Sequence, residues 1–134
     1  MNRSIIGFFL LVLILAACNN QKNSFIPAEN GLDAGREFID GCLKGDFIKA
    51  KFYLLPDEGN LQLLNKTESS YREKDKEGRQ ELRTASINIQ SVNEPNDSTV
   101  QLMYSTSADT TKKTVYILRR NAQWQVNLTM TMNK

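Results

Sequence analysis

The acid–base chemistry open to this chain of 134 residues is narrow, because the chain contains no histidine. The commonest general base, the Ser-His and Cys-His nucleophile systems and the commonest zinc ligand are therefore excluded. Carboxylates remain as candidate general bases. Between Leu82 and Met130 every carboxylate falls in a predicted turn, namely Glu94, Asp97 and Asp109. A catalytic base would therefore have to come from the predicted helices.

Four carboxylates on those helices are the remaining candidates: Glu37, Asp40, Glu58 and Glu68. The helical register places Asp40 beside the apolar stripe of its helix and not within it. A general base needs a perturbed pKa in a cleft, and the sequence offers Asp40 no second titratable group to provide one. We therefore predict no catalytic residue and no cofactor. We also expect no metal site, since clustered His, Cys or carboxylate ligands are missing.

Cys18 has the strongest chemical context in the sequence. Arg3 supplies positive charge, the run from Ile5 to Ala17 is almost entirely apolar, and polar residues follow. This is the layout of a secretory signal, and the run is shorter than the roughly 20 residues that span a bilayer. The sequence Leu15-Ala16-Ala17-Cys18 resembles a bacterial lipobox. In a lipobox, small residues admit the signal peptidase and the cysteine thiol accepts a diacylglycerol.

The lipobox implies a bacterial protein that is cleaved between Ala17 and Cys18 and held on a membrane by lipid on Cys18. The alternatives are an ordinary signal peptide cut after Ala17 and an uncleaved membrane helix. Asn19 follows the cysteine, whereas the inner-membrane retention signal of enteric bacteria has Asp there. No acidic cluster follows, as it does in the surface-export tag of some Bacteroidetes lipoproteins. We expect a cell-envelope location, on the outer membrane facing the periplasm.

The composition describes one globular domain without a nucleic-acid partner. Lys and Arg number 17 and Asp and Glu 15, so the net charge is +2 and no basic cluster suggests nucleic-acid binding. Hydrophobic residues make up 40% and charged residues 24%, which are globular values. We predict a signal peptide over residues 1–17, a polar tether over 18–32 and a folded domain over 33–132.

Helical periodicity follows the tether. Asp33 and Gly45 are expected to cap and end a first helix, whose apolar stripe is formed by Ala34, Phe38, Ile39, Cys42 and Leu43. Lipid on Cys18 would leave Cys42 without a disulfide partner, and we interpret it as a core residue, with a reactive thiol as the alternative. Asp46 and Asp57 are expected to cap a second and a third helix. The charged residues 72–77 are expected to be the solvated end of the third, or else an electrostatic docking face.

After Gly78 the hydrophobic period changes to two, which predicts strands. We expect strands over residues 82–93, 98–107, 112–120 and 124–131, with an irregularity in the first and a tight hairpin at 120–123. Turns are expected at 94–97 and 108–110. The strand at 112–120 is apolar on both faces and is therefore expected to be central. The predicted class is α+β, with three N-terminal helices packed on a curved four-stranded antiparallel sheet.

Two segments resemble a known family. Residues 34–55 are similar to the start, and Val115–Leu118 with Trp124–Val126 to the last hairpin, of small bacterial lipoproteins of Bacteroidetes type. These proteins carry a nuclear transport factor two-like, or cystatin-like, domain. The resemblance covers residues 30–132 and implies a cone-shaped fold. Relatives on that fold include isomerases, cyclases, dehydratases and non-catalytic binding domains, so the fold does not decide the activity.

Aromatic residues are the candidate lining of a pocket in such a cone: Tyr53, Tyr104, Tyr116 and Trp124. The alternative is that they fill the core. A Thr-, Asn- and Gln-rich strand face is a candidate surface for a homodimer or an envelope partner, with solvent exposure as the alternative; it comprises Gln101, Gln125, Asn127, Thr129 and Thr131. Ser98 and Thr110 each follow an Asp in predicted turns, as in the O-glycosylation pattern of Bacteroidetes periplasmic proteins.

These observations favour a lipid-anchored, non-enzymatic module of the cell envelope. It would bind a partner protein or a small apolar ligand at the membrane surface. The alternatives are a cone-fold enzyme, such as an isomerase, cyclase or dehydratase acting on a small hydrophobic substrate, and a structural homodimer joined through the sheet.

Overall fold

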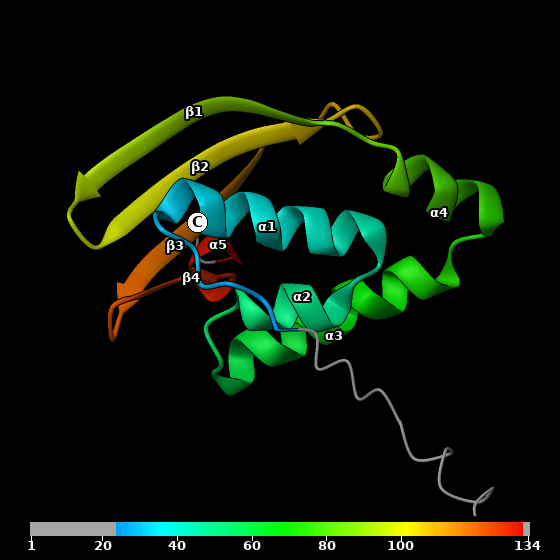
Figure 1. Cartoon of the computed structure of the whole chain (residues 1–134). Helices are drawn as coiled ribbons and strands as arrows, with labels where there is room; N and C mark the ends of the chain where they lie inside the picture. The colour runs from blue at the N-terminus through cyan, green and yellow to red at the C-terminus, as the bar shows by residue number, and fades with distance from the viewer. Residues whose placement is uncertain (1–23, 133–134) are drawn as a thin grey trace, which may run out of the picture.

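The computed structural model describes residues 24–132 (Figure 1). The predicted signal peptide, its cleavage site after Ala17 and the lipidated Cys18 lie outside the described residues. No helix in the described range combines the length and the apolar character that crossing a membrane requires.

The described chain has an α+β architecture with a four-stranded antiparallel sheet, as predicted. The helices are α1 (Gly31–Lys44), α2 (Phe47–Phe52), α3 (Glu58–Glu73), α4 (Lys76–Arg83) and α5 (Thr129–Met132). The strands are β1 (Ile87–Asn96), β2 (Thr99–Thr106), β3 (Lys113–Arg120) and β4 (Gln123–Asn127). The prediction of three N-terminal helices was wrong, because within residues 24–132 four helices precede the sheet and a fifth follows it.

Side-chain caps define the starts of α1, α2, α3 and α4. Asp46 and Asp57 cap α2 and α3 as predicted, and their carboxylates accept hydrogen bonds from the third following backbone N–H at 2.9 and 2.8 Å. The first helix begins before the predicted cap, because the Asn30 side chain accepts from the Asp33 backbone N–H at 2.8 Å. Gly45 ends α1 in the left-handed conformation, with φ of 73°.

The segment after α3 differs from the prediction. The chain is extended at Lys74, and Asp75 caps a separate helix by accepting from the Gly78 N–H at 2.8 Å. Residues 72–77 are therefore not one solvated helix end. The expected strand start at Leu82 was also wrong, because Leu82 lies in α4 and packs against the core. A local cap outweighs the weak alternation that begins at residue 82.

The sheet is a meander in the order β1-β2-β3-β4, with every neighbouring pair antiparallel. The expected irregularity in β1 is present as a register shift between Ile89 and Ser91. The turn predicted at 94–97 was placed too early, since β1 continues to Asn96. Asn121 and Ala122 form the predicted tight hairpin, with φ of 50° and 61°.

The predicted strand at 124–131 ends early, at Asn127, and its last residues instead form α5. The buried Asn60 on α3 is the physical reason. Its side-chain oxygen accepts from the backbone N–H groups of Leu128 at 2.6 Å and Thr129 at 3.3 Å, so these groups are turned away from a strand ladder. A side chain from a distant helix thus overrides the alternation.

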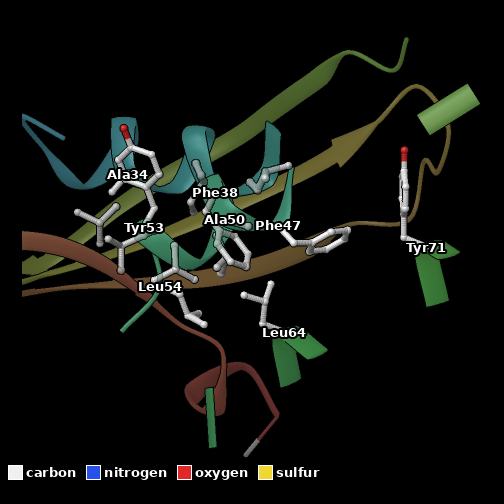
Figure 2. Packing of buried hydrophobic residues seen from close by; sticks show 14 residues of the cluster. Ala34, Phe38, Phe47, Ala50, Tyr53, Leu54, Leu64 and Tyr71 are labelled. Atoms are coloured by element: carbon white, nitrogen blue, oxygen red, sulfur yellow. The ribbon is translucent and has the colours of Figure 1, made fainter. Parts of the chain in front are cut away.

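The core lies between the sheet and α1 and extends to the buried faces of α2 and α3. The strands β1 and β2 arch over α1, while α2 and α3 lie on its other side (Figure 1). Figure 2 shows the buried cluster, which includes Phe38, Phe47, Tyr53 and Leu54. A Cβ at Gly41 would stand 3.0 Å from the backbone nitrogen of Ala50, so this glycine allows α1 and α2 to pack closely.

Candidate functional site

A largely apolar cavity of about 490 Å³ lies among α1, α3, α4 and the β2–β3 end of the sheet. This volume falls within the range of small-molecule sites, which is roughly 300–1,000 Å³. Its apolar walls include Phe38, Ile39, Cys42, Leu43, Tyr71, Leu82, Tyr104 and Leu128. The cavity is the candidate site because it joins apolar walls to a small number of polar groups.

Each wall follows from a local feature of the sequence. The stripe of α1 presents Phe38, Ile39 and Cys42 on one face, as residues three and four apart do. The break before Asp75 turns the chain so that α4 packs at the far end of α1, which brings Leu82 to the cavity (Figure 1). Tyr104 comes from β2, on the face that also carries the buried Leu102.

Two titratable side chains inside the cavity are held neutral. Burial raises the pKa of the Cys42 thiol to about 12, and burial, with the charge of Asp109, raises the pKa of the Tyr104 hydroxyl to about 12. Both groups therefore carry their protons at neutral pH. No hydrogen bond within residues 24–132 occupies the Tyr104 hydroxyl, so it can donate to a bound molecule.

The charged residues of the cavity lie at its rim. Asp109 and Lys113 form an ion pair at 2.8 Å with side chains 44% and 47% exposed. The hydrogen bond from Lys113, with further bonds from Thr111, holds the pKa of Asp109 well below its usual range. Asp109 is therefore a weak base although it shares the cavity with Tyr104. Glu81, the other carboxylate of the lining, is exposed.

The structure does not bring the four predicted aromatic residues together. Tyr104 lines the cavity. Tyr53 and Trp124 lie at a separate hollow of about 10 Å³, and the Tyr53 hydroxyl donates to the Ile26 carbonyl at 2.6 Å. Tyr116 is buried and pairs with Gln101 and Asn127, on the sheet face opposite to that of Val115 and Ile117.

Several cavity residues have no counterpart in the sequence-based site. Tyr71, Leu82 and Leu128 reach the cavity because α3 and α4 are separate helices and β4 ends at Asn127. Asp75 is of a residue type that commonly caps the start of a helix. This signal could have revealed that α4 is separate from α3. The end of β4 depends on Asn60, which no local signal indicates.

Asp40, the strongest carboxylate candidate on α1, belongs to an ion-pair network that joins α1 to α2. Its carboxylate lies 2.8 Å from the amines of both Lys44 and Lys49, and Lys49 also contacts Glu37. Burial raises the pKa of Asp40, but the hydrogen bonds and charges of the two lysines outweigh it and leave the pKa below the ordinary value of 3.8. This environment suits an ion pair rather than a general base.

The two candidate glycosylation residues are accessible. Ser98 is exposed in the β1–β2 turn, and its backbone N–H donates to the Asn96 side chain at 2.9 Å. Thr110 is exposed in the loop between β2 and β3. A glycan on either residue would meet no packed surface, and its presence stays a prediction.

Comparison with known proteins identifies no function for this site. No protein-family model matches the chain, and no curated protein matches it. Across residues 24–132, no three His, Cys, Asp or Glu side chains are grouped so that they could hold a metal ion.

Proposed function

We propose that this chain is a lipid-anchored protein of the cell envelope whose domain binds a small, largely apolar molecule without transforming it. The observation that carries the proposal is the cavity of about 490 Å³, with its apolar walls and the available hydroxyl of Tyr104. The lipobox at Leu15–Cys18 supports the anchor. The anchor would place the cavity beside a membrane, which is a source of apolar molecules.

The lining defines the class of ligand. An apolar body would be buried against Phe38, Leu43 and Leu82, and one acceptor oxygen would receive the Tyr104 hydrogen bond. A carbonyl, ester or ether oxygen fits this donor. We also propose that the domain is cone-shaped, as the resemblance to nuclear transport factor two-like proteins implies. The arching of β1 and β2 over α1 supports this shape (Figure 1).

An enzyme of the cone type is less well supported. Such an enzyme would need a buried carboxylate within reach of a tyrosine, acting as a general base. In this cavity Asp109 is half exposed and paired with Lys113, which lowers its pKa. This arrangement suits Asp109 to pairing with Lys113 and not to abstracting a proton from a substrate.

The polar sheet face offers fewer exposed residues for a partner than the sequence analysis expects. Asn127 is buried and accepts hydrogen bonds from Asn60 and from Thr129, while Thr131 belongs to α5. Gln101 and Gln125 remain half exposed on the sheet. The proposal therefore rests on the cavity rather than on a homodimer or an envelope partner at this face.

Native mass spectrometry of the full lipoprotein, gently extracted from its own envelope, tests the proposal. We expect an extra mass of a few hundred daltons beyond the lipid anchor. Ala108→Trp should displace it, because Ala108 lines the cavity. Ile48→Trp is the matched control, since Ile48 is 68% exposed and lies outside the cavity. Tyr104→Phe should lower the occupancy.

Two results would refute the proposal. The first is wild-type protein that carries no extra mass. The second is an extra mass that Ala108→Trp retains as fully as Ile48→Trp does. The anchor is tested in the same spectra, since Cys18→Ser should remove the mass of the diacylglycerol.

A further inference from the structure

A second hollow, of about 340 Å³, shares Tyr71 with the apolar cavity but has a different chemistry. Guanidinium groups dominate its lining, which comprises Gly45, Phe47, Tyr71, Arg72, Arg79 and Arg83. Among the residues that the structure describes, no carboxylate side chain lines it. The hollow is therefore a concave, positively charged place on the molecule.

The break between α3 and α4 creates this hollow. Arg72 lies in the last turn of α3, and the extended Lys74 turns the chain into α4. Arg79 and Arg83 are four residues apart on α4 and so lie on one face of that helix. Like charges at this spacing repel each other, which makes their placement in one hollow a cost that a bound anion would offset.

The partners of these arginines orient them without neutralising them. Arg79 donates through Nη1 to the backbone carbonyl oxygens of Arg72 and Lys74. Arg83 donates through Nε to the Tyr71 hydroxyl at 2.9 Å. Arg72 differs, because it is paired with Glu68. In the part of the chain that the structure describes, no ion pair engages Arg79 or Arg83.

The remaining donors can therefore serve a ligand. Within the described residues, no hydrogen bond uses Nη1 or Nη2 of Arg83. A planar guanidinium presents two parallel N–H groups to the oxygens of an anion. Two such groups on successive helical turns offer more donors than a single carboxylate can accept, whereas a phosphate group has enough acceptor oxygens to receive both.

We propose that the hollow between α3 and α4 binds a phosphate group through Arg79 and Arg83, with Tyr71 as the residue that positions Arg83. The phosphate could belong to a phospholipid headgroup or to free phosphate, and the chemistry of recognition is the same. This site goes beyond the proposed function, because it does not depend on the anchor or on an occupied apolar cavity.

The test uses the full chain in a neutral detergent. Inorganic phosphate is titrated by calorimetry, and phosphatidylglycerol in mixed micelles is followed by phosphorus NMR. Arg79→Gln combined with Arg83→Gln should weaken binding at least about tenfold, as expected when charge-assisted hydrogen bonds are lost. Arg119→Gln combined with Arg120→Gln removes the same charge from an exposed hairpin and should change the affinity less than about twofold.

Two single variants keep the test valid if the double variant unfolds. Arg83→Lys retains the charge but lacks the planar fork, and Tyr71→Phe retains the ring but lacks the hydroxyl. Both should weaken binding, whereas a purely electrostatic surface would not distinguish Arg83→Lys from the wild type. Thermal unfolding of each variant reports whether the fold is intact.

The two probes distinguish the sources of phosphate. Saturable binding of inorganic phosphate that depends on Arg79 and Arg83 supports a site for free phosphate. Saturation by phosphatidylglycerol alone, with the same dependence, supports a headgroup site. The proposal is overturned if neither probe saturates, or if the hairpin control loses as much affinity as the double variant does. An empty apolar cavity would leave this result unchanged.

Discussion

Asn60 shows how much a single buried amide can decide in this molecule. The side chain is fully buried and links three segments of the chain. Its amide nitrogen donates to Asp57 at 2.8 Å and to Asn127 at 3.2 Å, and its oxygen accepts from Leu128 at 2.6 Å. The residue thus holds the start of α3 against the end of β4.

Removal of this amide should destabilise the fold strongly. We expect Asn60→Ala to lower the free energy of unfolding by about 2–3 kcal/mol, because the buried Asn127 and the part-buried backbone N–H groups of Leu128 and Thr129 would lose hydrogen bonds together. Urea denaturation measures the effect. Gln62→Ala on the exposed face of α3 is the control and should stay within about 0.5 kcal/mol of the wild type. A similar loss for both variants would contradict the assigned role of Asn60.

At the scale of elements, an ion-pair network holds α1 to α2. Asp40 contributes stability that depends on pH, because Lys44 and Lys49 keep its pKa below 3.8 despite its burial. A carboxyl group whose folded pKa is lowered stabilises the fold fully above its unfolded pKa. That contribution is lost as the pH falls through the folded value.

The corresponding prediction compares Asp40→Asn with the wild type at two pH values. At pH 6 the variant should be less stable by about 1 kcal/mol, which is the scale of a half-buried charged hydrogen bond. Near pH 2 the difference should be smaller than at pH 6, because the wild-type carboxyl becomes protonated as the pH falls through its folded pKa. Urea denaturation at each pH measures it. Asp97→Asn in the exposed β1–β2 turn is the control and should stay within about 0.5 kcal/mol of the wild type at pH 6.

The β3–β4 hairpin contains a conformational cost that can be relieved. Ala122 adopts a φ of 61°, in the left-handed region that disfavours residues with a Cβ, and Asn121 precedes it at 50°. We expect Ala122→Gly to raise the free energy of unfolding by about 1 kcal/mol. Asn121→Gly should gain less, since Asn tolerates this conformation. Thermal unfolding distinguishes the two, and a loss of stability in Ala122→Gly would contradict the assignment.

Helix and strand boundaries were predictable where the residues that set them are neighbours in the sequence. The caps at Asp46 and Asp57 and the hairpin at 120–123 depend on neighbouring residues, and the structure confirms them. The last predicted strand was wrong because Asn60, 68 positions before Leu128, redirects the backbone. Of the predicted aromatic site, only Tyr104 lies at the large cavity, because the order of the elements does not specify which ends of the strands meet which helices.

At the scale of the whole molecule, the two cysteines allow the fold and the proposed anchor to be tested together. In the folded protein Cys42 should react with an alkylating agent at pH 8 much more slowly than it does in denaturant, because burial raises the pKa of its thiol to about 12 and leaves little thiolate. If Cys18 carries the proposed lipid, the full chain from its native host should yield one thiol in denaturant. Mass spectrometry of the alkylated protein counts the thiols. Cys42→Ala should yield none, and two thiols in the wild type would refute the anchor.

The sequence by itself determined the α+β class, the antiparallel meander and the absence of histidine chemistry, and it contains the segment resembling a lipobox on which the predicted envelope location rests. These properties follow from residue types and from periodicities of a few residues, which act through local backbone geometry. Only the tertiary structure decided which side chains share a cavity and that Arg79 and Arg83 meet at one hollow beside Tyr71. Those outcomes depend on a helix break and on a buried amide, whose effects reach residues far along the chain.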